Sequence, residues 1–487
     1  MVGVQGKSLV VEPVTRIEGE ARIIITLDDA GRVNNVYYQV LELRGFEAFC
    51  RGRLAEEMPR ISQTICGVCS VAHHMASAKA VDRLFGREPT ETATKIRELV
   101  HNIYMIDDHL LHLAVMALAD LLAERSSELR GLVDVARKYP EVVKRLISAR
   151  YITTSIIKKI CGRTVHVPIA IPGGVSRKLS KEDLEFIEKS LRELRGHLQY
   201  TLELFKSALS KSQRLQELSK REDYELKTYY LGLVSEDGSL NFYDGVLKIV
   251  DYRGSEVATF KPEDYTKYIT ERYEEWSYSK FPYLTIVGWR GIEEEGIVRV
   301  GSLARLNVSS RVPTEWASEE YKEMIDFFGG GKVINNTLAY HWARLIENIY
   351  ALEVAEMITV EDRDLLISGE VVNLEGTPMY EGVGVVEAAR GVLIHHYKTS
   401  LDFLVTEVNV ITPTAINNAA INAQLKKIAL RSHASPLVDE GLSSLVSDLE
   451  IAIRAFDPCN SCAAHVAGSR LIRVFIYDSR GNLLKVV

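Results

Sequence analysis

Four of the six cysteines in this 487-residue chain fall in two C-x-x-C pairs, and these residues are the best suited to chemistry. Cys66-Gly-Val-Cys69 lies near one end and Cys459-Asn-Ser-Cys462 near the other, so only folding could join them in one four-thiolate site. Soft thiolate ligands favour zinc, iron–sulfur or nickel over magnesium or calcium. Six cysteines are too few for a disulfide scaffold, and we expect a reducing compartment.

A structural zinc site is the plainest interpretation of this spacing taken alone. Zinc ribbons usually set such pairs on short knuckles within one small domain, however, whereas here the pairs stand far apart. Each pair is followed within four residues by a histidine, His73 after the first and His465 after the second. A helical run over Ser70–Phe85 would place Cys69 and His73 on one helix face. The repeated pattern therefore points to a shared centre, with zinc as the alternative.

The elements that must position these residues follow from the spacing of the apolar side chains. Alternation over Ala21–Leu27 and Val33–Val40, with a turn between them, predicts a β-hairpin. A helical period prevails from about residue 55 to 215, with long helices over Ala93–Leu122 and Lys181–Leu209.

The second half of the chain alternates between β-like and helical segments. We predict strands within 225–300, 371–385, 402–413 and 469–487, and helices over 318–357 and 415–455. Together these segments predict a mainly α (α+β) fold, with a large helical core, an N-terminal β-hairpin or sheet and a small mid-chain β insertion.

Composition limits what the chain can be. With 46% hydrophobic residues it can bury a metal site deeply, and a net charge of −7 without a basic stripe gives no footprint for nucleic acid. No apolar run reaches the roughly 18 to 20 residues that cross a bilayer, and no signal peptide is present, so we expect a cytoplasmic protein without a transmembrane segment. No stretch resembles a linker. We therefore expect one domain over 1–487, with a β-rich part at 1–50, an insertion at 225–300 and an extension at 466–487.

Two motifs carry a resemblance to a known family. The run Gln63-Thr-Ile-Cys-Gly-Val-Cys-Ser-Val-Ala-His73 resembles the first metal motif of nickel–iron hydrogenase large subunits, and Asp457-Pro-Cys-Asn-Ser-Cys-Ala-Ala-His465 resembles the second. Other segments similar to the family are Val14–Gly19, Arg44–Glu47, Asp108–His109, His341–Trp342, Glu387–Gly391 and Pro413–Thr414. The resemblance spans almost the whole chain and implies reversible heterolytic cleavage of H2 to protons and electrons.

The resemblance also implies a ligand set. In that family the outer cysteine of each pair binds nickel terminally and the inner one bridges to iron, which implies terminal Cys66 and Cys459 and bridging Cys69 and Cys462. The iron carries carbon monoxide and cyanide ligands. Four thiolates suit nickel, and the strong-field diatomic ligands hold iron in its low-spin state.

Further roles concern the proton and the open metal position. By resemblance, Cys459 takes a proton from H2 and Glu18 carries it onward. Arg390 resembles the arginine whose guanidinium hangs over the open position, and Asp108 is the partner that a buried arginine needs. Taken alone, Glu18 and Arg390 would be interpreted as solvated surface groups.

Three residues are expected to line the centre without binding metal. Thr414, beside Pro413, would hydrogen-bond a cyanide ligand, and His73 would donate to a bridging sulfur. Outside the motif, Thr414 could equally be a turn or helix-capping residue, and His73 a core histidine with its hydrogen bonds satisfied.

A second metal is also implied near the carboxy terminus. Glu47 and His465 resemble ligands of a magnesium ion or another hard cation, assisted by a backbone carbonyl around Val410. An oxygen-rich, partly hydrated site suits magnesium.

The chain departs from the family pattern in two places. Ala389 stands where the family usually has proline before the arginine, and Ile416 stands where many members have tryptophan, which bears on arginine placement and oxygen tolerance. Residues 466–487 resemble the extension that a maturation protease removes after nickel-insertion factors have loaded the site.

The resemblance also implies partners. Cys50 and Cys161 stand alone, so an iron–sulfur small subunit must carry the electrons away, across a large apolar interface near the cysteine pairs, with further electron-transfer subunits possible. Segments 341–347 and 391–397 are similar to soluble archaeal and bacterial groups. The alternatives are a non-catalytic relative of the complex I kind, which lacks the metal cysteines, and a structural zinc–thiolate protein.

Overall fold

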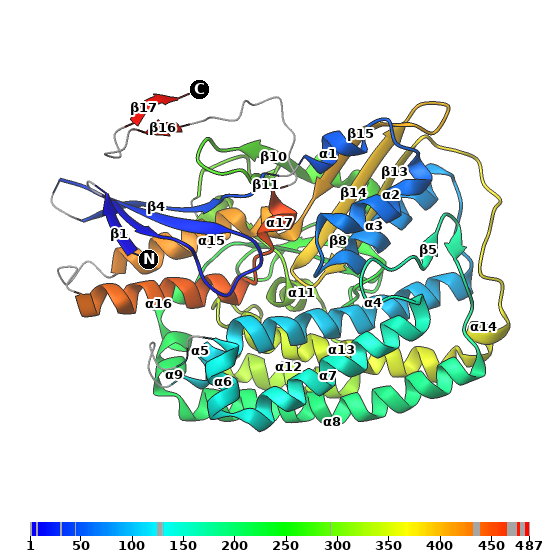
Figure 1. The fold of residues 1–487 in the computed structure, drawn as a ribbon, viewed down its shortest axis with the longest axis horizontal. Helices are drawn as coiled ribbons and strands as arrows, with labels where there is room; N and C mark the ends of the chain where they lie inside the picture. Colours follow the sequence, from blue (N-terminus) through cyan, green and yellow to red (C-terminus); the bar gives the residue numbers. More distant parts are fainter. Residues whose placement is uncertain are drawn as a thin grey trace.

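The computed structural model describes residues 2–5, 8–29, 32–43, 45–123, 129, 131–292, 294–431, 439–464, 475–477 and 483–486. Long helices fill one half of the molecule, and sheets fill the other (Figure 1). The predicted site residue His465 and the family-like residue Arg44 lie outside the described residues, as does most of the predicted extension.

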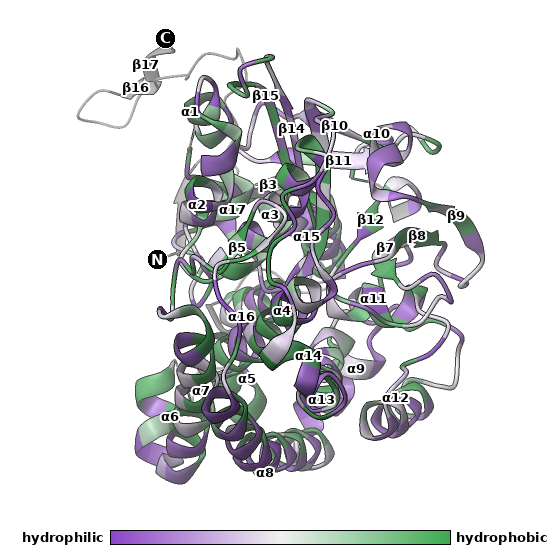
Figure 2. Cartoon of the chain, turned by 90° about the vertical axis from the view of Figure 1, so that its right-hand side faces the viewer, coloured by the Kyte–Doolittle hydropathy of each residue, from purple (hydrophilic) through white to green (hydrophobic). Residues whose placement is uncertain are grey.

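Four long helices form the helical core: α4 (Glu91–Leu111), α7 (Pro140–Cys161), α8 (Lys181–Lys211) and α13 (Ala339–Glu361). Helices α4 and α8 each pack against both α7 and α13, so the four close into a bundle. Helix α8 begins at a capping box, in which Ser180 and Asp183 bond each other's backbone N–H groups. Its hydrophilic outer face is visible in Figure 2. The predicted helical core is therefore confirmed.

The remaining α-helices are shorter, and several of them lie among the sheets (Figure 1). They are α1 (Phe46–Cys50), α2 (Met58–Ser62), α3 (Ser70–Leu84), α5 (Leu118–Leu122), α6 (Leu132–Lys138), α9 (Gln213–Lys220), α10 (Tyr265–Tyr268), α11 (Ser302–Val308), α12 (Glu315–Phe327), α14 (Arg363–Ser368), α15 (Pro413–Arg431), α16 (Asp439–Phe456) and α17 (Asn460–Ala463). A π-helical turn, His112–Ala117, joins α4 to α5.

The sheet that matters most for the site contains β13 (Glu381–Ala388), β14 (Gly391–Thr399) and β15 (Val405–Ile411), all antiparallel. Helix α3 packs directly on β13. A Cβ atom at Gly382 or Gly384 would lie 2.0 or 1.9 Å from the carbonyl oxygens of Ala80 and Ala76, so only glycine allows this close approach. The contact fixes the helix that follows the first cysteine pair against the strands that follow Tyr380.

The remaining strands form smaller sheets. They are β1 (Val2–Gln5), β2 (Ser8–Val11), β3 (Ala21–Leu27) and β4 (Val33–Val40) in one sheet; β12 (Val298–Arg299), β7 (Tyr229–Val234), β8 (Val246–Val250) and β9 (Glu256–Phe260) in another; and the pairs β5 (Ala170–Ile171) with β6 (Gly174–Val175), β10 (Ile269–Tyr273) with β11 (Lys280–Leu284), and β16 (Phe475–Tyr477) with β17 (Leu483–Val486). The N-terminal hairpin and the strands predicted within 225–300 are confirmed.

Two predictions about the second half were wrong in detail. The helix expected over 318–357 is broken between α12 and α13, because Gly329 and Gly330 adopt positive φ values of 97° and 72° that a helix cannot contain. The strand expected over 371–385 begins only at Glu381, and before it Val372 forms a single bridge to Gly174.

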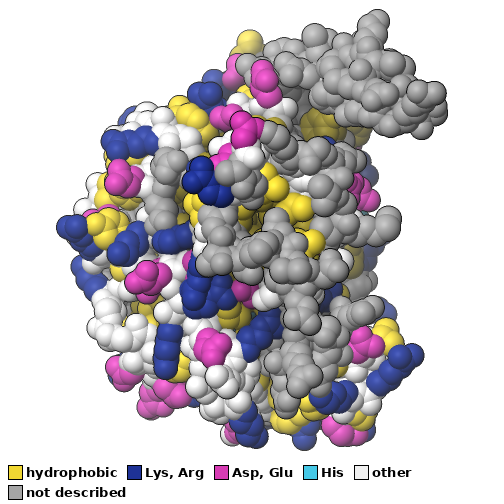
Figure 3. All heavy atoms as spheres, turned by 90° about the vertical axis from the view of Figure 1, so that its left-hand side faces the viewer, with side chains coloured by type: hydrophobic (Ala, Val, Ile, Leu, Met, Phe, Trp, Pro, Cys, Tyr) yellow, Lys and Arg dark blue, Asp and Glu magenta, His cyan; other side chains and the backbone are white. Residues whose placement is uncertain are grey.

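No helix within the described parts of the chain combines the length and apolarity needed to cross a membrane. On the face in Figure 3, basic and acidic side chains are interspersed, so neither sign of charge dominates that face.

Candidate metal centre

The two cysteine pairs lie together in the core. A single four-thiolate site, as proposed from the sequence, requires this arrangement. The four Sγ atoms all lie within 4.8 Å of one another, and the side chains are 1–4% exposed. The outer cysteines face each other, with Cys66 Sγ 3.4 Å from Cys459 Sγ, and the inner ones do likewise, with Cys69 Sγ 3.1 Å from Cys462 Sγ. None forms a disulfide. Four sulfurs around one metal ion at about 2.3 Å would stand roughly 3.8 Å apart, so the cluster has the size of a metal site.

Helix starts present both pairs. Cys69 is the N-cap of α3 and Cys459 the N-cap of the short helix α17, so each of these cysteines stands at the positive end of a helix. The N–H of His73 donates to the carbonyl of Cys69 at 3.3 Å, which starts the helix that sequence analysis predicted. A helix start favours thiolate over thiol, but at Cys69 and Cys459 burial and the neighbouring sulfurs outweigh this effect and raise both pKa values.

Glu18 approaches the same cluster from the amino-terminal segment. It forms a parallel bridge with Cys459, its carbonyl accepts the Asn460 N–H at 3.1 Å, and its carboxylate accepts the Ser461 N–H at 3.2 Å. Burial raises the pKa of Glu18, and the negative charge of Cys66 raises it further. A carboxyl group with a raised pKa binds a proton more readily than an exposed glutamate, which suits a group that takes up and releases protons.

Without metal, the four cysteines share their protons unequally. Hydrogen bonds from Cys459, Cys462 and Cys69 lower the pKa of Cys66, so this sulfur holds the negative charge. Burial raises the pKa of Cys459 and of Cys462 well above the ordinary value. A hydrogen bond from Cys459 lowers the pKa of Cys69, but burial and the Cys66 thiolate outweigh it and raise that pKa to about 11. Most of these thiols must therefore lose a proton when a metal binds.

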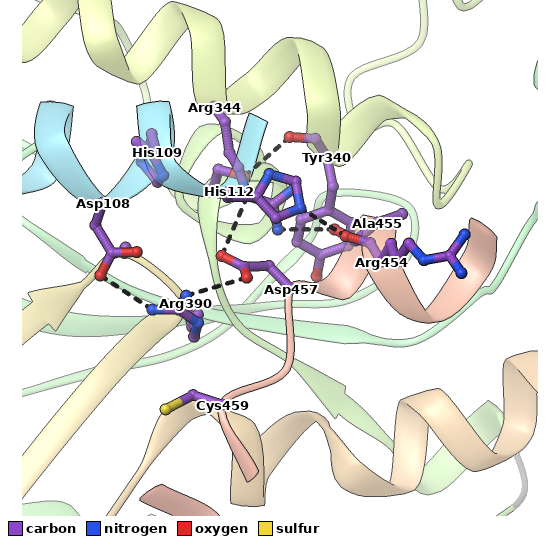
Figure 4. A network of polar contacts seen from close by, with 12 residues as sticks. Asp108, His109, His112, Tyr340, Arg344, Arg390, Arg454, Ala455, Asp457 and Cys459 are labelled. Atoms are coloured by element: carbon purple, nitrogen blue, oxygen red, sulfur yellow. Dashed lines mark hydrogen bonds and ion pairs between the residues drawn. The ribbon is translucent and has the colours of Figure 1, made fainter. Parts of the chain in front are cut away.

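A buried arginine stands beside the sulfurs. Arg390, 2% exposed, donates from Nη1 to Asp108 Oδ2 at 3.0 Å and from Nη2 to Asp457 Oδ1 at 3.1 Å, as Figure 4 shows. Asp457 has a positive φ of 56°, which turns the chain between α16 and Cys459. The sequence named Asp108 as the partner of Arg390, and the structure adds Asp457. Two carboxylates thus hold the guanidinium in a single orientation.

A small closed cavity adjoins the inner cysteines. Its lining residues are Cys69, His73, Ala388, Arg390, Leu393, Pro413, Thr414, Cys459 and Cys462. Pro413 is the first residue of α15, and the Thr414 hydroxyl accepts the Cys459 N–H at 2.9 Å, which leaves its own proton free to donate. One wall is apolar and another offers hydrogen-bond donors.

The imidazole of His73 links the sulfurs to the central sheet. Its Nε2 lies 3.5 Å from Cys462 Sγ, and its Nδ1 lies 3.0 Å from Nε2 of His395 on β14. Nδ1 of His395 is 2.5 Å from the Tyr397 hydroxyl. This chain of contacts fixes the ring of His73, so that its Nε2–H can point at the sulfur.

Glu47, in α1, is buried and contacts β11 and β15. Its Oε1 accepts a hydrogen bond from the Val410 N–H at 3.0 Å. The Lys280 ammonium lies 3.0 Å from the same oxygen, 3.2 Å from Glu271 Oε2 and 3.1 Å from Asn409 Oδ1. The oxygen-rich environment suits a hard cation, which would replace the ammonium on Glu47.

Sequence reasoning missed several neighbours of the site. His395 and Glu347 lie in segments that resemble archaeal and bacterial relatives. This resemblance could have identified both residues as candidates. Lys280 and Arg305 stand in no recognised motif, and only the fold brings them to Glu47 and to the turn before Arg390.

Comparisons with known proteins agree over nearly the whole chain. A family model described as nickel-dependent hydrogenase matches residues 44–125 and 160–465, and one described as HoxL-like matches residues 8–43. A protein of Archaeoglobus profundus that is named as an iron-sulfur subunit of F420-non-reducing hydrogenase is 39% identical, with 99% of both chains covered. The beta subunit of the NAD-reducing hydrogenase HoxS of Cupriavidus necator is 34% identical, covering 98% of this chain and 99% of that one.

Solved structures agree as well. An NAD+-reducing NiFe-hydrogenase in the H2-reduced state superposes with a TM-score of 0.87 at 34% identity, covering 95% of this chain and all of the other. The Ni-Fe-Se hydrogenase of Desulfovibrio vulgaris Hildenborough, at 22% identity and a TM-score of 0.73, covers 94% of this chain and 99% of its own, and shares the fold.

Removing one inner cysteine should empty the centre. We expect Cys69→Ala to lower the transition-metal content of the purified chain roughly tenfold or more, because a buried thiolate ligand is lost. The matched control is Cys161→Ala, a buried cysteine outside the cluster, which should keep its metal. Mass spectrometry of metals per chain measures both, and a fully loaded Cys69→Ala chain would contradict the site.

Metal affinity should fall with falling pH. Because the thiols remain protonated below a pKa of about 11 for Cys69, each thiol proton displaced weakens binding by up to roughly tenfold per pH unit below that value. Equilibrium titration of the metal-free chain with Cd2+, followed by thiolate absorbance between pH 6 and 8, tests the sign. An affinity that stays constant or rises as the pH is lowered would be inconsistent with protonated thiols.

Proposed function

The chain belongs to the nickel-dependent hydrogenase family, and from that membership we propose the part that each site residue takes in the cleavage of H2. The chain is an oxidoreductase, a hydrogenase large subunit that splits H2 into protons and electrons at a nickel–iron centre. The observation that carries the proposal is the buried convergence of Cys66, Cys69, Cys459 and Cys462, since four thiolates are suitable ligands for nickel.

Cys66 and Cys459 would hold the nickel as terminal ligands, and Cys69 and Cys462 would supply the thiolates shared with iron. Support for a shared centre comes from the sulfur contacts, since Cys459 Sγ lies 3.4 Å from Cys66 Sγ and 3.0 Å from Cys462 Sγ, and Cys462 Sγ lies 3.1 Å from Cys69 Sγ. When bound, the nickel–iron centre supplies the redox chemistry that takes two electrons from H2.

The closed cavity beside the inner cysteines accommodates the carbon monoxide and cyanide ligands of iron. Ala388, Leu393 and Pro413 supply an apolar wall, which suits carbon monoxide. The Thr414 hydroxyl and the Arg390 guanidinium supply donors, which suit the negatively charged cyanide.

The proton taken from H2 would pass first to Cys459 and then to Glu18. The thiol of Cys459 and the Glu18 carboxylate are hydrogen-bonded, and burial raises the pKa of Glu18 so that it can accept a proton from the sulfur. Arg390 stays charged, and its two carboxylate partners hold the guanidinium beside the sulfurs, where it orients H2 and excludes water. His73 donates to the sulfur of Cys462.

Glu47 and His465, with a carbonyl near Val410, hold magnesium. Glu47 and Glu271 offer two negative charges against the single ammonium of Lys280, which favours a divalent cation taking the place of the ammonium on Glu47.

An iron–sulfur small subunit receives the electrons. The only other cysteines, Cys50 and Cys161, are buried and stand apart from the cluster, so they offer no relay. The relatives are named as subunits of hydrogenases, which supports an assembly with this and further electron-transfer subunits. We also propose that nickel-insertion factors load the centre, that a maturation protease removes residues 466–487, and that the enzyme is cytoplasmic.

The two alternative functions gain no support. A non-catalytic complex I-like relative would lack the metal cysteines, yet all four are present and converge. A structural zinc site would not require Arg390, Asp108 and Asp457 to gather around the sulfurs.

Replacing Glu18 should block proton exit without disturbing the metals. We expect Glu18→Gln to lower H2-dependent dye reduction about a hundredfold, because glutamine cannot carry the proton. Nickel content and the infrared bands of the metal-bound diatomic ligands should stay unchanged. Glu20→Gln, an exposed neighbour, is the control. Wild-type turnover by loaded Glu18→Gln would show that protons leave by another residue.

Replacing Glu47 should weaken magnesium binding. We expect Glu47→Gln to lower magnesium affinity roughly tenfold, because the charged ligand is lost while its shape is kept. Metal analysis after dialysis against a magnesium series measures this, with the exposed Glu56→Gln as control. Equal magnesium affinities in the two variants would rule out Glu47 as a ligand.

A further inference from the structure

The guanidinium of Arg305, in α11, holds the backbone of the turn that carries Arg390. Its Nη1 donates to the carbonyl of Ala388 at 2.9 Å, and its Nη2 donates to the carbonyl of Ala389 at 3.0 Å. Two consecutive carbonyls directed at one planar group fix both peptide planes before Arg390. The direction in which the Arg390 side chain leaves the backbone depends on those planes.

Arg305 is itself held rigidly. Its Nε and Nη2 donate to the two carboxylate oxygens of Glu347 at 2.5 and 2.6 Å, and its Nη1 also donates to Glu387 Oε2 at 2.6 Å. With the two carbonyls, these contacts use all five N–H donors that a guanidinium possesses. The side chains of Arg305, Glu347 and Glu387 are all 0% exposed. A lysine, with three donors on one nitrogen, cannot make these contacts together.

The same cluster reaches the carboxylate partner of Arg390. His109 Nε2 lies 2.9 Å from Glu347 Oε2, and His109 follows Asp108, which accepts from Arg390 Nη1 at 3.0 Å. The Leu233 N–H donates to Glu387 Oε1 at 2.7 Å, which ties the cluster to β7 as well. One buried network therefore holds both the turn before Arg390 and the helix segment that supplies Asp108.

The turn needs such a restraint because its own residues provide little. Ala389 has no ring to fix its φ angle, as a proline would have. Gly391 follows Arg390 at a φ of +131°, and a Cβ there would lie 2.5 Å from the Val300 side chain, so this position is confined to glycine. Ala388 and Gly391 pair across the β13–β14 hairpin, so the segment that needs a further restraint is the two-residue turn of Ala389 and Arg390 between them.

We propose that Arg305 is a positioning residue for Arg390, fixing the Ala388–Arg390 turn so that the Arg390 guanidinium faces the metal centre. The proposal rests on the role proposed above for Arg390. Arg305 does not line the cavity beside the cysteines, and it acts through the backbone carbonyls that it holds.

The first test compares Arg305→Lys with a matched control. Arg97 is also fully buried, and it donates to Asp82 and to the carbonyls of Ile171 and Gly174, away from Arg390. We expect Arg305→Lys to lower H2 turnover per nickel about ten- to hundredfold and to shift the infrared bands of the metal-bound cyanide ligands. Arg97→Lys should lose similar thermal stability but leave turnover per nickel and bands unchanged. Equal effects of the two variants on turnover and bands would overturn the proposal.

The second test combines Arg305→Lys with Arg390→Lys. If Arg305 acts through Arg390, the double variant should turn over within about twofold of Arg390→Lys alone, and should share its band positions. A further full tenfold loss would overturn the proposal. An Arg390→Lys variant with wild-type turnover and bands would instead refute the proposed function of Arg390.

Arg305→Lys could fail to fold, because it leaves buried carboxylates poorly paired. In that case Glu387→Gln carries the test, since it removes one charged partner of Arg305 but keeps an oxygen acceptor in place. We expect it to move the cyanide bands in the same direction as Arg390→Lys, by a smaller amount. Bands that remain at the wild-type positions in a nickel-loaded Glu387→Gln chain would overturn the proposal.

Discussion

Four sulfur atoms within 4.8 Å of one another, buried between the helical bundle and the central sheet, set the requirement that the rest of the structure meets. Thiolates repel one another in a medium of low dielectric constant, so the surroundings must supply positive charge and N–H donors. The starts of α3 and α17 and the guanidinium of Arg390 supply them. The site therefore depends on helix ends and on a buried cation as much as on the cysteines.

Burying the Arg390 cation in the core creates a second requirement, because each buried charge needs a partner of opposite charge. Arg390 is neutralised by Asp108 and Asp457, and the turn that carries it is held by Arg305, which is neutralised in turn by Glu347 and Glu387. Each set of contacts satisfies donors and acceptors that would otherwise be costly to bury. The close packing of α3 on β13, possible only because of Gly382 and Gly384, brings the first cysteine pair to this network.

The sequence predicted what is locally encoded. The hairpin over Ala21–Val40 follows from alternation, and α8 follows from helical periodicity and its cap, so both were predictable. The cysteine pairs were recognisable by spacing and motif. Two contacts were not predictable: that of Lys280 with Glu47, and that of Arg305 with the turn before Arg390. They join residues 233 and 84 positions apart in the chain, and no local sequence pattern marks such contacts. The break before α13 was missed although three glycines mark it, since the helical period was given more weight.

We propose that one cluster of four cysteines holds both nickel and iron. Anomalous X-ray diffraction from crystals of the purified enzyme, recorded at the nickel and the iron absorption edges, tests it most directly. We expect one nickel peak and one iron peak, both among the sulfurs of Cys66, Cys69, Cys459 and Cys462, with iron on the side of Thr414. A single zinc peak between the four sulfurs, or nickel and iron peaks elsewhere in the molecule, would contradict it.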